Sequence, residues 1–153
     1  MTIRLARLED IPQISGLLSE FFDYNAKQQP TDYIATVENG KYPNSVLDSD
    51  TGVFFIAETN STIIGLIHIE EDSTPPYPSI ASHKFACIVD FFVKPQYRKK
   101  NIGHLLLEEA KAWALSRNLD YIELTVLENN EVGKNFYNKA NFIEASRTMR
   151  LYF

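Results

Sequence analysis

The sequence is poor in the residue types that build disulfides and metal sites. Among its 153 residues there is one cysteine, Cys87, and there are three histidines. A lone cysteine forms no internal disulfide, there is no CxxC pair, and the histidines are far apart along the chain. Neither Cys87 nor any serine lies in a recognisable nucleophile motif. We therefore expect a reduced thiol, no bound metal and no covalent enzyme intermediate.

Long apolar runs and an excess of positive charge are also missing. No stretch approaches the roughly 20 apolar residues of a membrane-spanning helix, and the start of the chain lacks a signal-peptide pattern. The 15 Lys and Arg residues are outnumbered by 20 Asp and Glu residues, which gives a net charge of −5. This balance disfavours nucleic acid and anionic membranes as partners. These observations predict a complete, cytoplasmic protein.

The common nucleotide-binding fingerprints are absent. The sequence contains neither the Walker pattern G-x4-G-K-[ST] nor G-x-G-x-x-G. A nucleoside triphosphatase and a dinucleotide-dependent enzyme therefore have no support.

The residues that are present predict one α/β domain over 1–153. Alternation and apolar runs predict strands at 2–7, 53–58, 62–70, 85–93 and 121–126, with two further candidates at 142–147 and 148–153. Helical spacing predicts helices at about 10–23, 102–117 and 130–139, and 31–38 is either a short helix or a surface connection. Three consecutive strands in the middle favour a mixed sheet flanked by helices, with six or seven strands in total.

A short basic loop joins the strand 85–93 to the helix that begins at Ile102. It contains four cations in seven residues: Lys94, Arg98, Lys99 and Lys100. Free N–H groups, the helix dipole and side-chain charge favour an anion at a helix N-terminus. The loop is therefore either a phosphate-binding site or a solvated cationic turn.

Two blocks of the sequence resemble the GNAT superfamily of N-acetyltransferases. The first reads Val93-x-Pro95-x-Tyr97-Arg98-x-Lys100-x-Ile102-Gly103-x-x-Leu106-Leu107. Asn101 stands where the family's coenzyme-binding motif usually has its first glycine, and Asn tolerates left-handed backbone geometry. The second reads Val126-x-x-x-Asn130-x-x-Gly133-x-x-Phe136-Tyr137-x-Lys139-x-Asn141-Phe142. In that block the family usually has Ala at position 133 and Gly at 141.

The resemblance implies the GNAT fold, with a sheet splayed between strands 4 and 5, and acetyl-CoA as co-substrate. Backbone groups of Phe91, Phe92 and Val93 would bind the pantetheine arm, and Asn130 would contact the coenzyme arm. The pyrophosphate would be held by the N–H groups of Arg98, Lys99, Lys100, Asn101, Ile102, Gly103 and His104. Tyr137 matches the family's tyrosine that contacts the coenzyme and protonates the departing thiolate; the alternative is a core aromatic beside Phe136.

The base that takes the proton of the attacking amine has several candidates. Asp90 is a lone carboxylate in an apolar strand, so it is either a base or amine anchor or a structural hydrogen-bonded group. His68 is either a proton relay or a satisfied core histidine. Three acidic residues end the preceding strand and either attract a cationic substrate or are merely solvated: Glu70, Glu71 and Asp72.

The resulting hypothesis is acetyl transfer from acetyl-CoA to a primary amine by direct attack in a ternary complex. The acceptor is a small-molecule amine, such as a polyamine, or a peptide or protein amine. The alternative is a non-catalytic or regulatory CoA-binding domain of the same fold. Dimerisation is common in this family, so a homodimer is an assembly that the resemblance allows.

Overall fold

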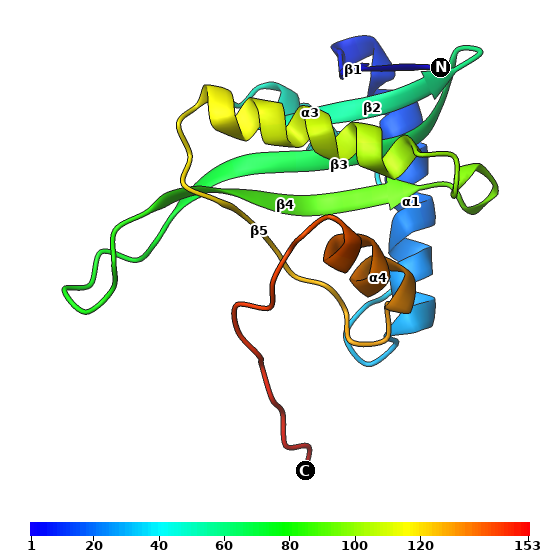
Figure 1. The fold of residues 1–153 in the computed structure, drawn as a ribbon. Helices are drawn as coiled ribbons and strands as arrows, with labels where there is room; N and C mark the ends of the chain where they lie inside the picture. Colours follow the sequence, from blue (N-terminus) through cyan, green and yellow to red (C-terminus); the bar gives the residue numbers. More distant parts are fainter.

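The computed structural model describes residues 1–153 and contains five strands and four α-helices (Figure 1). The strands are β1 (Thr2–Leu5), β2 (Gly52–Thr59), β3 (Thr62–Ser73), β4 (Lys84–Val93) and β5 (Ile122–Leu124). The helices are α1 (Ile11–Gln28), α2 (Lys41–Leu47), α3 (Ile102–Ser116) and α4 (Glu131–Lys139). Short 3-10 turns at Leu8–Asp10 and Pro95–Tyr97 precede α1 and α3. No helix is both long and apolar enough to cross a membrane.

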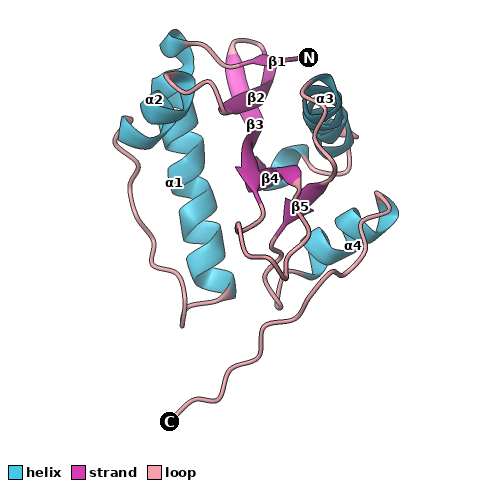
Figure 2. Ribbon diagram, turned by 90° about the vertical axis from the view of Figure 1, so that its left-hand side faces the viewer, coloured by secondary structure: helices cyan, strands magenta, loops and turns pink.

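The strands form one mixed sheet in the order β1-β2-β3-β4-β5. All neighbours are antiparallel except β4 and β5, which are parallel. Helices α1 and α2 cover one face, and α3 and α4 lie on the other (Figure 2). Each face buries its own apolar cluster, one centred on Ile14, Leu18 and Phe54 and the other on Ile67, Leu106 and Leu107. The three-layer α/β arrangement is the predicted one.

The strands predicted at 53–58 and 62–70 are present and form a hairpin. Strands β2 and β3 are joined by Asn60 and Ser61, which have φ values of 48° and 59°. Two left-handed residues give the turn a twist that suits antiparallel strands. Asn141, at the position where the family usually has Gly, is also left-handed, with φ 65°.

Strand β4 contains a bulge at Val89. His68 on β3 is paired with Asp90, but Ile69 is paired with Ile88, so Val89 has no partner across the ladder. An extra residue in one strand reverses the faces of the side chains that follow it. Before the bulge, Ile88 packs on the α3 face; after it, Phe91 packs there, while Phe92 joins the α1 cluster. Asp90 is thereby turned toward the α1 and α2 side.

Strands β4 and β5 part beyond their first few residues. Their pairing stops at Ile88 and Leu124, whereas β4 continues to Val93 with β3 on its other side. Residues 89–93 therefore have no neighbouring strand where β5 would continue. This is the splay that the resemblance implied.

Two expectations about individual elements are wrong, and one open alternative is decided. The sheet has five strands instead of six or seven, because residues 142–153 form no strand. Of the two alternatives for residues 31–38, the surface connection is the one present: these residues are mostly exposed, and the next helix begins only after Gly40, whose φ is 91°. Helix α1 runs to Gln28, five residues beyond its expected end at Asp23, and Tyr24 continues its packing against the core there.

Asp10 ties the first strand to the first helix. Its carboxylate accepts hydrogen bonds from Arg4 at 2.7 and 2.8 Å and from the Arg7 N–H at 2.7 Å, and Arg4 also pairs with Glu58 of β2. The side chain makes no capping hydrogen bond to α1. The hydrogen bond from Arg4 is the main cause that lowers the pKa of Asp10.

Replacing Asp10 with Asn is expected to lower the free energy of unfolding by about 2 kcal/mol at neutral pH, because Arg4 loses a buried ionic partner. A carboxyl whose pKa is lower in the folded state stabilises the protein above its unfolded pKa of about 3.9, and this stabilisation is lost as the pH falls through the folded pKa. Urea titrations should therefore show a difference in the free energy of unfolding between wild type and variant, and this difference should become smaller at acidic pH. Glu9→Gln is the control, since its pair with Arg7 is exposed; an equal loss in both variants would contradict the assignment.

Candidate active site

A cavity of about 490 Å³ opens where β4 and β5 part. Its walls come from both parted strands, from α1, from the chain before α4, and from Tyr137 of α4. Both predicted catalytic residues, Asp90 and Tyr137, line it, and so do Glu70 and Asn130. Its lining includes two carboxylates and no Lys or Arg. The fold thus brings the second sequence block and the β4 carboxylate to one acidic, largely apolar cavity.

Asp90 is held by a polar network behind the cavity wall. The Tyr42 hydroxyl of α2 donates to the Asp90 Oδ2 at 2.5 Å, and the same hydroxyl lies 2.5 Å from the Nδ1 of His68. Because the hydroxyl has a single proton, His68 Nδ1 is the donor in the second bond. Burial is the largest cause that raises the pKa of Tyr42, followed by the charge of Asp90, so the hydroxyl stays a donor. Asp90 is 8% exposed and has a fixed orientation.

His68 belongs to this network and does not line the cavity. It is 1% exposed, and its Nε2 has no hydrogen-bond partner and lies 3.6 Å from Glu70 Oε2. His68 also contacts the ring of Phe54. The structure therefore places His68 behind Asp90, between Tyr42 and the half-buried Glu70.

Tyr137 lies in an aromatic group on the α3 and α4 side of the sheet. Its ring packs against Phe136, Phe142 and Phe91, with centroids 5.4, 5.6 and 6.3 Å away. Its hydroxyl makes no hydrogen bond within the protein. Burial raises the pKa of Tyr137, so the phenol keeps its proton at physiological pH. The packing orients the ring while the hydroxyl stays available to a ligand.

The basic loop presents a row of free donors. The N–H groups of Lys99 through His104 donate to no carbonyl or side chain of the protein, whereas the N–H of Arg98, also expected to bind the pyrophosphate, donates to the Pro95 carbonyl at 3.2 Å. Asn101 has φ 64° and Lys99 has φ 61°, so the loop contains two left-handed residues just before α3. Consecutive free N–H groups in such a turn and at a helix N-terminus make a concave anion site. Asn101 thus adopts the left-handed backbone geometry that it was expected to tolerate.

The cationic side chains of the loop are less free than its backbone. Arg98 donates from Nε to the Val93 carbonyl at 2.9 Å and stacks over the Tyr24 ring at 4.8 Å. Lys94 pairs with Glu20 at 2.9 Å, and Lys100 lies over the ring of Tyr97. Arg98 therefore shapes the loop from inside, and the backbone supplies most of its free donors.

Other predicted residues lie in different surroundings. The side chain of Phe92 packs in the α1 cluster, so only its backbone faces the parted strands. Asn130 caps α4 by accepting from the Gly133 N–H at 2.9 Å, and its amide nitrogen stays free. Glu71 pairs with Arg117, and Asp72 is exposed outside the cavity. Of the acidic run at the end of β3, only Glu70 reaches the cavity.

Sequence reasoning missed Tyr42 and the residues of α1 and its following loop that line the cavity: Phe21, Phe22, Asn25 and Tyr33. The phenylalanines have the helical spacing of core residues, which hides their position at a cavity. Tyr42 lies in a polar region without periodicity, so only the tertiary contact with Asp90 reveals it.

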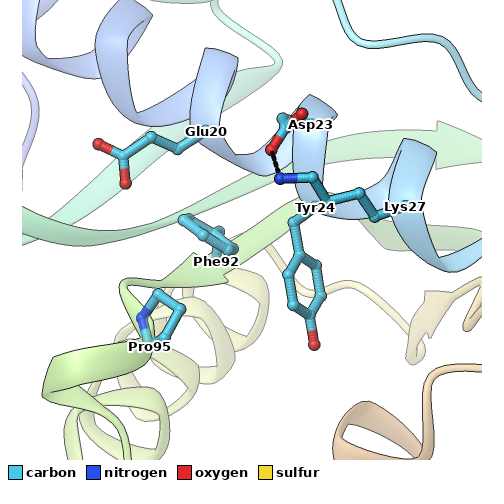
Figure 3. A pocket seen from close by; sticks show the side chains of 6 residues that line it. All are labelled: Glu20, Asp23, Tyr24, Lys27, Phe92 and Pro95. Carbon is cyan, nitrogen blue, oxygen red and sulfur yellow. Dashed lines mark hydrogen bonds and ion pairs between the residues drawn. The ribbon is translucent and has the colours of Figure 1, made fainter.

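A second, smaller hollow of about 260 Å³ lies between α1 and the end of β4 (Figure 3). Asp23 and Lys27 form an ion pair at 2.6 Å on its rim, and Tyr24 and Phe92 line it. It contains none of the predicted catalytic residues. The structure also has no group of three or more His, Cys, Asp or Glu side chains placed to hold a metal ion.

Solved structures with the same fold are numerous. A variant of the BH1408 protein from Bacillus halodurans has a TM-score of 0.93 at 22% identity, covering 100% of this chain and 99% of that one. Aminoglycoside N-acetyltransferase AAC(6')-Iy, in complex with CoA, has a TM-score of 0.77 at 16% identity, covering 99% and 98%. The aminoglycoside 6'-N-acetyltransferase AAC(6')-IG from Acinetobacter haemolyticus has a TM-score of 0.77 at 11% identity, covering 100% and 98%. At these low identities, the structural similarity shows that this chain shares their fold.

Comparison of the sequence with curated proteins gives no match. The family model described as "Acetyltransferase (GNAT) family" matches residues 12–142, which include both sequence blocks, the parted strands and the basic loop. The chain belongs to the GNAT acetyltransferase family.

Proposed function

We propose that the protein transfers an acetyl group from acetyl-CoA to a primary amine bound in the cavity between β4 and β5. The observation that carries this proposal is the convergence of Asp90 and Tyr137 on one cavity beside the basic loop and its free N–H groups. Family membership supports acyl transfer, and structural relatives bound to CoA support the co-substrate.

The residues present fit coenzyme A. The free N–H groups from Lys99 to His104 suit the pyrophosphate, and the open side of β4 at residues 91–93 suits the amide groups of the pantetheine arm. Gly103 lies against the Phe136 ring, where a Cβ would come within 3.3 Å of the ring edge. The acetyl thioester supplies the electrophilic carbonyl, and the protein supplies position and proton transfer.

Asp90 is the proposed base or amine anchor. An alkylammonium has a pKa of about 10.4, so the acceptor arrives charged and must lose a proton before it attacks. Asp90 and Glu70 give the cavity the negative charge that attracts such a cation. Tyr42 holds the carboxylate of Asp90 in place from the other side.

Tyr137 is the proposed acid. As the bond from the acetyl carbon to sulfur breaks, the departing thiolate needs a proton, and the phenol keeps one available. Cys87 also lines the cavity, but burial, together with Glu70, Asp72 and Glu123, raises the pKa of its thiol. A protonated thiol is a poor nucleophile. This supports direct attack by the amine over an acyl-cysteine intermediate.

The experiment that tests the function combines CoA binding with turnover. We expect acetyl-CoA to raise the melting temperature and amines from a panel of polyamines, amino sugars and lysine peptides to cause CoA release. Stabilisation by CoA with no turnover of any amine would support the alternative of a non-catalytic CoA-binding domain. No stabilisation by CoA would reject both.

Replacing Asn101 with Val is expected to weaken CoA binding about 10-fold, which corresponds to about 1.4 kcal/mol, because a β-branched residue resists the left-handed conformation. Without CoA, the variant loop would leave the left-handed conformation at position 101, and binding would have to restore that conformation. Asn101→Gly should bind CoA as tightly as wild type. Asn118→Val is the matched control, since Asn118 has φ 55° at the other end of α3. Titration calorimetry measures all three, and equal affinities for the two valine variants would contradict this role of the loop.

A further inference from the structure

The two carboxylates of the cavity lie on the same face of the sheet, one on each of two neighbouring strands. Asp90 of β4 is paired with His68 of β3, and Glu70 follows His68 by two residues along β3. Side chains two residues apart in a strand share a face, so Glu70 lies on the α1 side with His68. The imidazole lies between the acids, with Nδ1 3.9 Å from Asp90 Oδ2 and Nε2 3.6 Å from Glu70 Oε2. The acids are thus separated by the width of an imidazole ring.

The hydrogen-bond network around Asp90 leaves Glu70 without a donor. The Tyr42 hydroxyl gives its proton to Asp90, so His68 donates from Nδ1 and its Nε2 is a bare lone pair. This buried nitrogen has no hydrogen-bond partner and cannot donate to the carboxylate that it faces. The half-buried Glu70 side chain accepts no hydrogen bond from the protein, and its one charged-group contact is this imidazole. Glu70 is therefore an acceptor that only a ligand can satisfy.

The chemistry of the cavity matches two ammonium groups joined by an apolar spacer. An alkylammonium has three donors and no acceptor, and with a pKa of about 10.4 it is charged at neutral pH. One such group satisfies one carboxylate, so Asp90 and Glu70 together suit two. Methylenes between them gain from apolar walls, whereas buried hydroxyls without partners would cost free energy. The apolar lining comes from α1, its following loop and β4: Phe21, Phe22, Tyr33, Ile88 and Val89.

We infer, on the basis of the proposed acetyl transfer, that the acceptor is a linear diamine whose second ammonium is bound by Glu70. The reacting amine lies at Asp90, which takes its proton. Its nitrogen then forms a bond to the acetyl carbon as the carbon–sulfur bond breaks, and Tyr137 protonates the sulfur. The second ammonium keeps its proton throughout. The product is a monoacetylated diamine with one positive charge fewer, so it loses its ion pair with Asp90 and leaves more readily.

A substrate series with the wild-type protein tests the acceptor. Terminal diamines of three to six carbons are compared with the monoamine, the amino alcohol and the amino acid of the same length. At the best length, kcat/KM for the diamine should exceed that for the monoamine and the amino alcohol about 10-fold or more, and the amino acid should be poorest, since its carboxylate meets Glu70. A diamine that exceeds the monoamine at no length would overturn the diamine acceptor and leave acetyl transfer standing. No turnover of any amine would reject acetyl transfer itself, and the diamine with it.

Replacing Glu70 with Gln tests the residue. The ratio of kcat/KM for the diamine to kcat/KM for the monoamine should fall about 10-fold, through a higher KM for the diamine. Glu123→Gln is the matched control, because Glu123 is exposed on β5 outside the cavity, and it should keep the wild-type ratio. Glu70→Lys should reverse the order, so that the amino acid becomes a better acceptor than the diamine. With the fold checked by circular dichroism, an unchanged ratio in Glu70→Gln would overturn the role of Glu70.

Discussion

Replacing Tyr137 with Phe is expected to lower kcat about 100-fold or more while CoA binds with unchanged affinity. General acid catalysis typically contributes about 10²- to 10⁴-fold, and the phenylalanine ring keeps the packing on Phe91, Phe136 and Phe142. Single-turnover kinetics should show the loss directly, so that slow product release does not hide it. Titration calorimetry should give the same CoA affinity for both proteins.

Tyr77→Phe is the matched control, because Tyr77 is 63% exposed and lies outside the cavity. It should keep full activity. The pH dependence provides a second check. Since burial raises the pKa of Tyr137, the acid form persists above the ordinary tyrosine pKa of about 10, and kcat should show no descending limb below that pH. An unchanged kcat in Tyr137→Phe would remove this residue from the chemistry.

Replacing Asp90 with Asn is expected to reduce kcat/KM for the amine about 100-fold, with little change in CoA affinity. The amide has the same shape and still accepts from Tyr42, but it neither takes a proton nor attracts a cation. Activity of the variant should recover as the pH rises toward the amine pKa of about 10.4, where the acceptor is neutral without help. Initial rates across this range measure the recovery.

Two comparison variants sharpen the Asp90 experiment. Asp72→Asn makes the same charge change on an exposed residue outside the cavity, so it should keep wild-type kinetics. Tyr42→Phe leaves the carboxylate but removes the hydrogen bond that orients it. We expect kcat/KM for the amine to fall about 10-fold. This loss is near the lower end of the roughly 1.5–3 kcal/mol typical of a hydrogen bond to a charged group. If Asp90→Asn behaves like Asp72→Asn, Asp90 is a structural carboxylate.

Much of the fold was predictable because its signals are local. The hairpin between β2 and β3, the strand that becomes β4 and the helix α3 each follow from a periodicity and a turn within about 20 residues. The predicted strands at 142–147 and 148–153 failed for a different reason. Alternation in that segment is real, but a strand also needs a partner, and the protomer provides none there. The weak periodicity of residues 31–38 left a short helix and a surface connection open, and the surface connection is present.

The site was predictable where residues close in sequence also act together. The free N–H groups from Lys99 to His104 are contiguous, so one turn and one helix start already position them. Tyr137 of the second block lines the cavity. Tyr42 was not predictable, because its role arises only from contact with Asp90, 48 residues away.

The sequence by itself determined most element types, the position of the basic loop before α3 and the family resemblance, since motifs and periodicities depend on neighbouring residues. Only the tertiary structure decided which residues share the cavity. The bulge at Val89 turns Asp90 toward Tyr42 and His68 while Phe91 faces α4, and that choice depends on the register between β3 and β4. Register is set by pairing between distant strands, and a shift of one residue exchanges the two faces of a strand. No local sequence pattern in β4 predicts this register.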